Sequence, residues 1–516
     1  MNIDPEFQNQ LLLTFGLVSV FIFLTWIVQA RKRRQKNGIY NLPGPRQYFL
    51  GGIGNLLELS YKPGTIKCML KWCSTYGPIF QVYFGPIYGI ALNSAPYIQK
   101  LYGSSDLDHL SKSFMYDLLK PVWQDGLAIS KGEKWKSRRK LLTHVVTFKC
   151  LKSYMTIFNR EGKRLTERFD KVFDDGKVHP INETTLSAAL SVIIEATLGI
   201  NIFEANDVEG ISEFVRNAQT YKEIATTRLL KPWLLINPIW RFHPLSIKHD
   251  KAVASLHAFA RKVIEERKQS YSKERKLLAD SPEDETEKVG KSLIEELIEA
   301  NIPDEGIVEE VMTSIGAGYE TSGITLHFLL FFLALNPEHQ ELCREEADYI
   351  FDSDLCPDGN VTFDALSKLK HLERCILETL RLVPPVFIIM RKITAPLKLD
   401  ENLEIPANTN VAVPVQGIHR NPEYYPDPDI FDPDRFLPEN SQTRNQYSFM
   451  AFAGGPRKCI GYKFSLMELS VLTAMILRKF EISTIDKWET ITLLPDVTLI
   501  PNKPLNFQFR RRATNC

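Results

Sequence analysis

The sequence predicts a mainly α-helical fold with a smaller β region. Most of residues 95–385 carry apolar side chains three and four residues apart, as on one face of a helix. Strand-like alternation is found in Tyr76–Leu92, around Gly85-Pro86, and in short segments after about residue 394. Residues 266–290 are charged and poor in apolar side chains, which predicts an exposed connection between helices. The 516 residues suffice for one large domain or two smaller ones.

The charges and the cysteines argue against several classes of function. The 63 Lys and Arg residues nearly balance the 62 Asp and Glu residues, so the composition does not favour a nucleic acid partner. The eight cysteines lack the spacing of a disulfide framework, as expected in a reducing compartment. Seven of them are expected to be small, buried apolar side chains, whereas Cys459 differs because of its neighbours.

The N-terminal segment is predicted to be a single transmembrane helix. Residues 11–28 contain no charge and are long enough to span a bilayer. Acidic residues precede them and a basic cluster follows at 31–36, so the positive-inside rule places residues 1–10 in the lumen and the rest in the cytosol. A cleaved signal peptide would have the reverse charge pattern and a small-residue cleavage site.

A basic and proline-rich hinge is expected at residues 29–50, before a cytosolic domain at 51–516. Its segment Leu42-Pro-Gly-Pro-Arg46 cannot continue the anchor helix, because proline lacks an amide hydrogen and restricts the backbone. We expect this stiff connection to fix how the domain sits on the membrane.

Ile302–Leu335 is predicted to be one long helix, of about 50 Å at 1.5 Å per residue. It is mostly apolar, but internal polar residues and the lack of a basic flank favour a buried central helix over a second membrane span. Glu320 and Thr321 place an acid beside an alcohol near two glycines, an arrangement that could relay protons. Alternatively, Thr321 bonds back to the helix and Glu320 pairs with a cation.

Several cations have positions that suit an anionic ligand. Trp135 and Arg139 are four residues apart on a predicted basic helix and could reach inward together. The apolar segment from Val383 to Met390 ends at Arg391, so it could line a cavity that has an anionic group at its edge. Residues 104–127 are expected to help shape the same pocket.

Glu378 and Arg381 are three residues apart on the predicted helix Leu366–Leu382, so they can pair on one face. Taken alone, such a pair is usually found on a protein surface. A third charged residue, Arg435, follows Pro433 between two aromatic residues.

The loop Phe452–Gly461 reads FAGGPRKCIG. Its glycines and proline predict a tight turn with inward amides. Arg457, Lys458 and the start of the following helix favour a thiolate at Cys459. A lone thiolate is a poor structural zinc site and a good axial ligand for haem iron. A nucleophile and an inert cysteine remain alternatives at this point.

Taken together and in this order, the motifs resemble those of the cytochrome P-450 monooxygenases, over essentially the whole chain. The haem-loop pattern FxxGxRxCxG matches Phe452, Gly455, Arg457, Cys459 and Gly461. The oxygen-activation segment matches at Ala317, Gly318, Glu320, Thr321 and Ser322. The ExxR pair is Glu378 and Arg381 with Arg435 as third member, and the WxxxR motif is Trp135 to Arg139.

The resemblance implies a cytochrome P-450 fold around haem b, with Cys459 as the metal ligand. The residues implied to bind the cofactor are Trp135, Arg139, Arg391, Arg457 and Phe452. Glu320 and Thr321 would be the catalytic acid–alcohol pair that delivers protons during oxygen activation. Glu378, Arg381 and Arg435 would form a buried structural network.

The resemblance also implies a microsomal monooxygenase in the endoplasmic reticulum membrane. It would insert one oxygen atom of O2 into a fatty acid, hydrocarbon, pheromone-like lipid, steroid or xenobiotic. Electrons from NADPH would come through a reductase that docks near Lys136, Arg138 and Lys458, with cytochrome b5 as a second candidate partner. The alternatives are a haem-thiolate isomerase or dehydratase acting on peroxides without a reductase, and a haem carrier or sensor without turnover.

Ser187–Gly199 and Leu382–Arg391 are most similar to the animal clan that includes fatty-acid ω-hydroxylases and many insect enzymes. Several lipid hydroxylases of this clan have a glutamate at the position of Ala317 that can bond covalently to the haem. Alanine cannot form this bond, so we expect the haem to be held without it.

Overall fold

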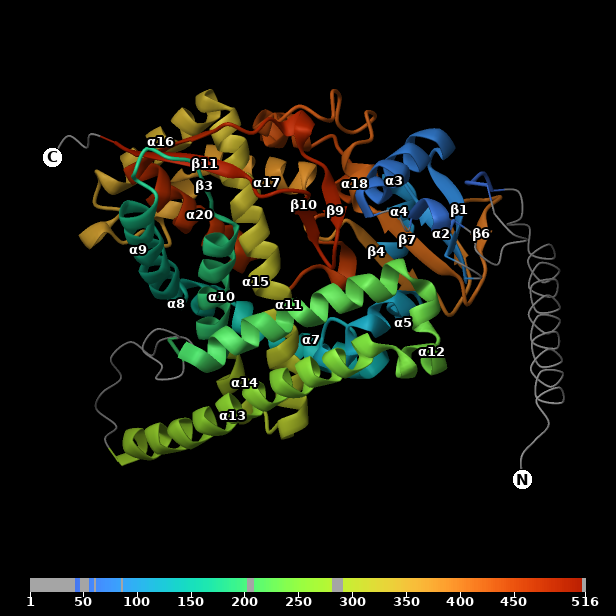
Figure 1. Cartoon of the computed structure of the whole chain (residues 1–516), viewed down its shortest axis with the longest axis horizontal. Coiled ribbons are helices and arrows are strands. Elements are labelled where there is room, and N and C mark those ends of the chain that lie inside the picture. The colour runs from blue at the N-terminus through green and yellow to red at the C-terminus, as the bar shows by residue number, and fades with distance from the viewer. Residues whose placement is uncertain are drawn as a thin grey trace.

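The computed structural model describes residues 42–46, 55–59, 62–84, 87–201, 208–280 and 291–512. Within these residues helices dominate and the sheets are small, as expected (Figure 1). The longer helices are α3 (Lys62–Tyr76), α7 (Gly132–Leu142), α9 (Met155–Val172), α10 (Asn182–Leu198), α11 (Val208–Leu230), α13 (Pro244–Asp280), α15 (Asp304–Leu335), α16 (Pro337–Phe351), α17 (Lys370–Leu382) and α20 (Tyr462–Lys479). The predicted anchor at 11–28 lies outside the described residues.

The largest sheet has the strand order β1-β2-β7-β4. Its strands are β1 (Ile79–Phe84), β2 (Ile87–Leu92), β7 (Asn410–Pro414) and β4 (Ile388–Lys392). β1 and β2 form the predicted antiparallel hairpin, with Ile79 opposite Leu92. β7 is parallel to β2 and antiparallel to β4, so it joins the end of the predicted apolar wall to the sheet of the hairpin.

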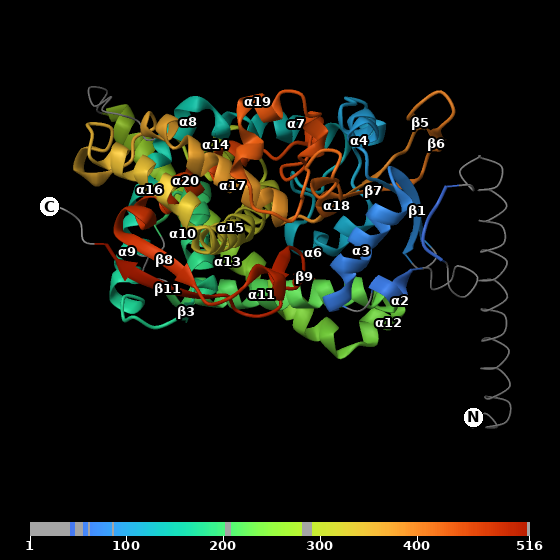
Figure 2. The same ribbon diagram turned by 90° about the horizontal axis from the view of Figure 1, so that it is seen from above.

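The smaller sheets are formed by late parts of the chain. A three-stranded sheet has the order β3 (His179–Pro180), β11 (Asn506–Arg511), β8 (Phe480–Thr484). Two-stranded sheets pair β9 (Leu493–Pro495) with β10 (Leu499–Pro501) and β5 (Leu397–Lys398) with β6 (Glu404–Ile405). Figure 2 shows the largest sheet at one end of the molecule and α9, α10, α16 and α20 grouped toward the other.

The helix α15 is the centre of the helical part, as the sequence predicts. Its phenylalanines at 328, 331 and 332 are almost completely buried. A Cβ added at Gly323 would lie 2.9 Å from the Cα of Leu186, so glycine permits the close contact with α10. Among the described helices, α15 is the one long and apolar enough to cross a membrane, but 78% of its apolar window is buried in protein.

The predicted connection at 266–290 is wrong for residues 266–280, which continue α13. Polar contacts stabilise this part of the helix in place of apolar packing. Gln269 donates to Glu265 at 3.0 Å one turn earlier, and Arg267 Nε donates to Glu295 at 3.1 Å. Glu295 belongs to α14 (Leu293–Glu299), so this charged segment is bound to a neighbouring helix. Low apolar content therefore did not indicate a loop.

Candidate functional site

The Cys459 loop is fixed against the helix α4 (Ala95–Tyr102). Cys459 follows the 3-10 helix η10 (Gly455–Arg457) and precedes α20. Its amide donates to the carbonyl oxygen of Phe452 at 2.8 Å, which closes the loop. Gly455 has φ +61°, and a Cβ there would lie 1.5 Å from the carbonyl oxygen of Tyr102. Only glycine fits this contact, which gives the loop a defined position.

Cys459 is accessible although protein groups surround it, so an open space adjoins its side chain. The residue is exposed, yet burial among the surrounding groups raises the pKa of its thiol. The Gly461 amide and the cations Arg139, Lys458 and Lys112 act in the opposite direction without overcoming burial. The thiolate expected from the loop sequence therefore needs a further positive charge, and a bound metal ion would supply it.

Two buried arginines close to this space lack carboxylate partners among the described residues. Arg391 on β4 is 1% exposed and donates only to the Met390 carbonyl oxygen, at 3.1 Å. Arg457 donates to the carbonyl oxygens of Leu127 and Ser130 at 3.3 and 2.6 Å, and its guanidinium lies 4.1 Å over the Trp135 ring. Among the described residues, the Nε and Nη2 atoms of Arg391 and the Nε of Arg457 have no hydrogen-bond acceptor.

Lys112 belongs to the same group of cations, although no sequence motif marks it. It forms an isolated β-bridge with Arg391, and its ammonium lies 4.4 Å over the Tyr116 ring. Burial lowers its pKa far below the usual lysine value, and the nearby charges of Arg391 and Arg457 lower it further. Only this long-range pairing brings Lys112 into the site.

We call Lys112, Arg139, Arg391 and Arg457 the cation cluster. Burial lowers the pKa of Arg457 to about 9, and Arg391 and Arg139 contribute to that shift. Burial also lowers the pKa of Arg139, while Cys459 raises it. Buried cations without anions are costly, so the cluster fits a ligand that brings carboxylates. A haem would meet this requirement with its two propionates, and Cys459 would be its thiolate ligand.

The structure places Glu320 and Thr321 next to each other on α15, with different partners. Glu320 is buried, pairs with Lys222 of α11, and accepts a hydrogen bond from Thr498 at 2.7 Å. Lys222 also pairs with Asp496 at 3.3 Å. The Thr321 hydroxyl donates to the carbonyl oxygen of Ala317 at 2.8 Å. Glu320 thus pairs with a cation and Thr321 bonds back to its own helix, as the alternative to a proton relay predicts. The proton relay itself stays a prediction.

Glu378 and Arg381 form the expected buried pair. Two parallel hydrogen bonds of 2.7 Å join them, and both side chains are completely buried. Arg381 also donates to the carbonyl oxygens of His419, Pro428 and Ile430 at 2.7–3.1 Å. Arg435 Nε lies 3.5 Å from Glu378, so the third member is also present. The protein itself therefore supplies the hydrogen-bond partners of Arg381, and no ligand is needed.

Arg138 departs from the expected docking surface. Its Nε lies 3.7 Å from the buried carboxylate of Glu310, and its side chain is only 12% exposed. Lys136 and Lys458 are exposed, as the docking hypothesis requires. Lys458 lies 3.9 Å over the Tyr462 ring. Two of the three expected cations therefore remain available to a partner.

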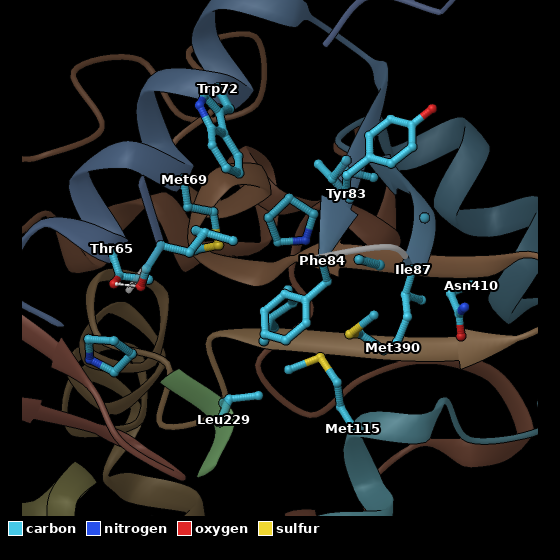
Figure 3. Close-up of a pocket in the computed structure, with 18 of the residues that line it drawn as sticks. Thr65, Met69, Trp72, Tyr83, Phe84, Ile87, Met115, Leu229, Met390 and Asn410 are labelled. Atoms are coloured by element: carbon cyan, nitrogen blue, oxygen red, sulfur yellow. Dashed lines mark hydrogen bonds between the residues drawn. The ribbon is translucent and has the colours of Figure 1, made fainter. Parts of the chain in front are cut away.

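An apolar pocket lies next to β4 (Figure 3). Phe84, Met115 and Met390 point toward one another around it. The predicted wall contributes Phe387, Ile388 and Met390, and the 104–127 region contributes Phe114 and Met115. Residues of α3, β1, β2, β7 and the end of α11 complete the lining; Thr65 and Asn410 are two of its few polar residues. Met390 is followed in β4 by Arg391 of the cation cluster, and successive side chains of a strand point to opposite faces, so the pocket and the cluster use the two sides of this strand.

Comparison with known proteins shows the family of this chain. The family model described as Cytochrome P450 matches residues 43–509. The rat protein named cytochrome P450 4V2 is 32% identical over 442 residues, which cover 84% of this chain and 82% of that protein. Cytochrome P450 4c21 of Blattella germanica is 31% identical over 507 residues, which cover 96% and 99%. The chain therefore belongs to the cytochrome P450 family, in the clan of these relatives.

Proposed function

We propose that this haem-thiolate monooxygenase inserts one oxygen atom of O2 into a lipophilic substrate, with electrons passed from NADPH by a reductase. The observation that carries the proposal is the cation cluster near Cys459, in which the buried Arg391 and Arg457 have N–H groups without an acceptor among the described residues. Bound haem would supply the oxygen activation. The side chains of this protein would bind the cofactor, deliver protons and admit the substrate.

The cation cluster would hold the cofactor by its carboxylates. Arg391 and Arg457 have free N–H groups for charge-assisted hydrogen bonds, and Lys112 and Arg139 add positive charge. The Arg457 guanidinium packs over the face of the Trp135 ring, which stabilises it through a cation–π contact. Phe452 fixes the amide of Cys459 through its carbonyl oxygen. The thiolate of Cys459 would then be the ligand that donates electron density to the metal.

Thr321 and Glu320 would deliver the protons that oxygen activation requires. The Thr321 hydroxyl donates to Ala317 and is half-buried, so its oxygen can accept a second hydrogen bond. Glu320, held in place by Lys222 and Thr498, would pass protons to Thr321 through water. This acid–alcohol pair favours the monooxygenase over the peroxide isomerase or dehydratase, which needs no protons from such a pair.

The substrate would enter from the membrane. Leu229 and Leu230 line the pocket at the end of α11, and the chain then continues into α12 (Asn237–Phe242). Around α12 the large apolar side chains of Trp233, Ile236, Phe242 and Ile247 are exposed, Phe242 by 88%. We propose that this surface rests on the endoplasmic reticulum membrane beside the anchor at residues 11–28, with residues 1–10 in the lumen. The hinge at 29–50 would join the anchor to the domain at 51–516.

The lining of the pocket is almost entirely apolar, which favours fatty acids, hydrocarbons, pheromone-like lipids, steroids or apolar xenobiotics. The reductase, with cytochrome b5 as a second candidate, would dock at Lys136 and Lys458 on the surface nearer Cys459. Salt should weaken this docking.

The proposal is tested with the Cys459→Ser variant and with omission of the electron donor. We expect Cys459→Ser to lose the strongly red-shifted Soret band of the reduced CO complex, because a hydroxyl replaces the thiolate. Product formation by the wild-type protein should require NADPH and reductase. Product that forms without them would contradict the monooxygenase, and an unchanged band would contradict the ligand.

A further inference from the structure

A second set of metal-ligating side chains lies between α16 and α17, outside the haem site. Each helix carries a histidine followed four residues later by a cysteine: His339 and Cys343 on α16, His371 and Cys375 on α17. Residues four apart share one face of a helix. The two faces meet, so the four side chains occupy one interface.

The contacts between the pairs are short. The sulfurs of Cys343 and Cys375 are 3.6 Å apart, and His339 Nδ1 lies 3.2 Å from His371 Nε2. The ligand atoms of Cys343, Cys375 and His371 all lie within 4.8 Å of one another. Both cysteines are 0% exposed and His371 is 6% exposed. The two imidazoles beside the buried thiols add nitrogen ligands to this group of sulfurs.

The sulfur–sulfur and nitrogen–nitrogen distances match those of a tetrahedral site. Zinc bonds of about 2.3 Å to sulfur and about 2.0–2.1 Å to nitrogen place two sulfurs about 3.8 Å apart and two nitrogens about 3.3 Å apart. The observed separations are 3.6 and 3.2 Å. Two thiolates and two neutral imidazoles would balance a divalent cation and satisfy its coordination.

We propose that Cys343, Cys375 and His371, with His339 as the fourth ligand, bind a thiophilic cation of the Zn²⁺ class between α16 and α17. His339 is half-buried and gives the site its access to solvent. The bound cation would join the two helices one turn before Glu378 and Arg381, which lie on α17. The site would therefore be structural and separate from the haem.

Metal binding requires some side chains around His371 to keep their contacts and one to change its contact. Glu346 accepts hydrogen bonds from the amides of His371 and Leu372 at 2.7 and 3.0 Å, which fixes the start of α17. Arg374 Nη2 lies 2.7 Å from His371 Nδ1. Coordination through Nε2 needs the proton on Nδ1, so Arg374 must turn away toward Asp434, which is 3.6 Å from it. Coordination by the two sulfurs replaces their protons, so binding releases protons to solvent.

The test uses the full-length, haem-loaded protein, in which Cys459 is already occupied. The protein is exposed to Zn²⁺, dialysed against a weak chelator, and analysed for zinc per chain and by zinc X-ray absorption. We expect about one zinc per chain, with sulfur neighbours at about 2.3 Å. Wild-type protein without retained zinc, or with only nitrogen and oxygen neighbours around the zinc, overturns the proposal.

Variants locate the site. Cys343→Ser and Cys375→Ser should each lose the retained zinc and the rise in Tm that zinc gives the wild type. The matched control is Cys356→Ser, because Cys356 is another buried cysteine of the same region, 5% exposed, outside this group of ligands. Zinc retained equally by all three variants overturns the proposal. If the serine variants do not fold, the sulfur neighbours in the wild-type absorption spectrum decide alone.

Discussion

Two buried groups of arginines in this protein have opposite surroundings. Arg381 fills its hydrogen bonds with Glu378 and with three carbonyl oxygens. Arg391 is as buried as Arg381, yet two of its nitrogens have no acceptor in the described part of the chain, and the other cations around it repel it. The first group is complete within the protein, while the second is complete only with an anionic ligand. Satisfied and unsatisfied burial thus separate a structural network from a binding site.

The largest expected effect is a loss of stability when the network of Glu378, Arg381 and Arg435 is broken. Glu378→Gln removes the carboxylate that Arg381 and Arg435 share, so it leaves buried cations without compensation. We expect a loss of about 3–5 kcal/mol in the free energy of unfolding. Denaturant unfolding and the yield of haem-loaded protein measure it.

The matched control is Glu373→Gln, since Glu373 is exposed on the same helix. This control should change stability by less than about 0.5 kcal/mol. Equal stability of the Glu378→Gln variant and the control would show that the Glu378 network is not structural.

A second prediction concerns the incomplete group. Arg391→Met removes donors that the protein does not use and relieves repulsion from Arg457 and Lys112. We expect haem affinity to fall by about 1.5–3 kcal/mol, the contribution of a hydrogen bond to a charged group, roughly a ten- to hundredfold change. Transfer of haem to an apo-globin acceptor measures the loss.

The stability of the haem-free protein should not fall in Arg391→Met, which distinguishes this variant from Glu378→Gln. Lys392→Met, at the exposed next position of β4, is the control and should keep its haem. A parallel loss of haem-free stability in Arg391→Met would place Arg391 with the structural network.

The contrast also explains what the sequence predicts well. Glu378 with Arg381, and Gly455 with Cys459, are local in sequence, so spacing alone identifies them. Lys112 and Lys222 enter their sites through a β-bridge and through α11, contacts that no local pattern encodes. For the same reason the partner of Glu320 was foreseen only as an unspecified cation. At residues 266–280 the local pattern predicted a loop, but a long-range polar contact with α14 stabilises a helix there.

The third prediction concerns Glu320, which has features of both groups. Like Glu378 it is buried and paired within the protein, yet it lies beside Thr321 in the oxygen-activation segment. Lys222 holds it there, and the attraction of Glu320 and Asp496 raises the pKa of Lys222 despite burial. If the pair with Lys222 positions Glu320 for proton delivery, Lys222→Met should lower the product formed per NADPH by roughly two- to fivefold, or about 0.5–1 kcal/mol.

Two variants define the scale for that measurement. Lys222→Arg keeps the charge and should retain most of the coupling, while Thr321→Ala removes the hydroxyl itself and should release more peroxide than Lys222→Met. A purely structural Glu320 gives another result, in which Lys222→Met lowers Tm and leaves the product formed per NADPH unchanged. In that case Glu320 belongs with Glu378, and proton delivery would depend on Thr321 and water alone.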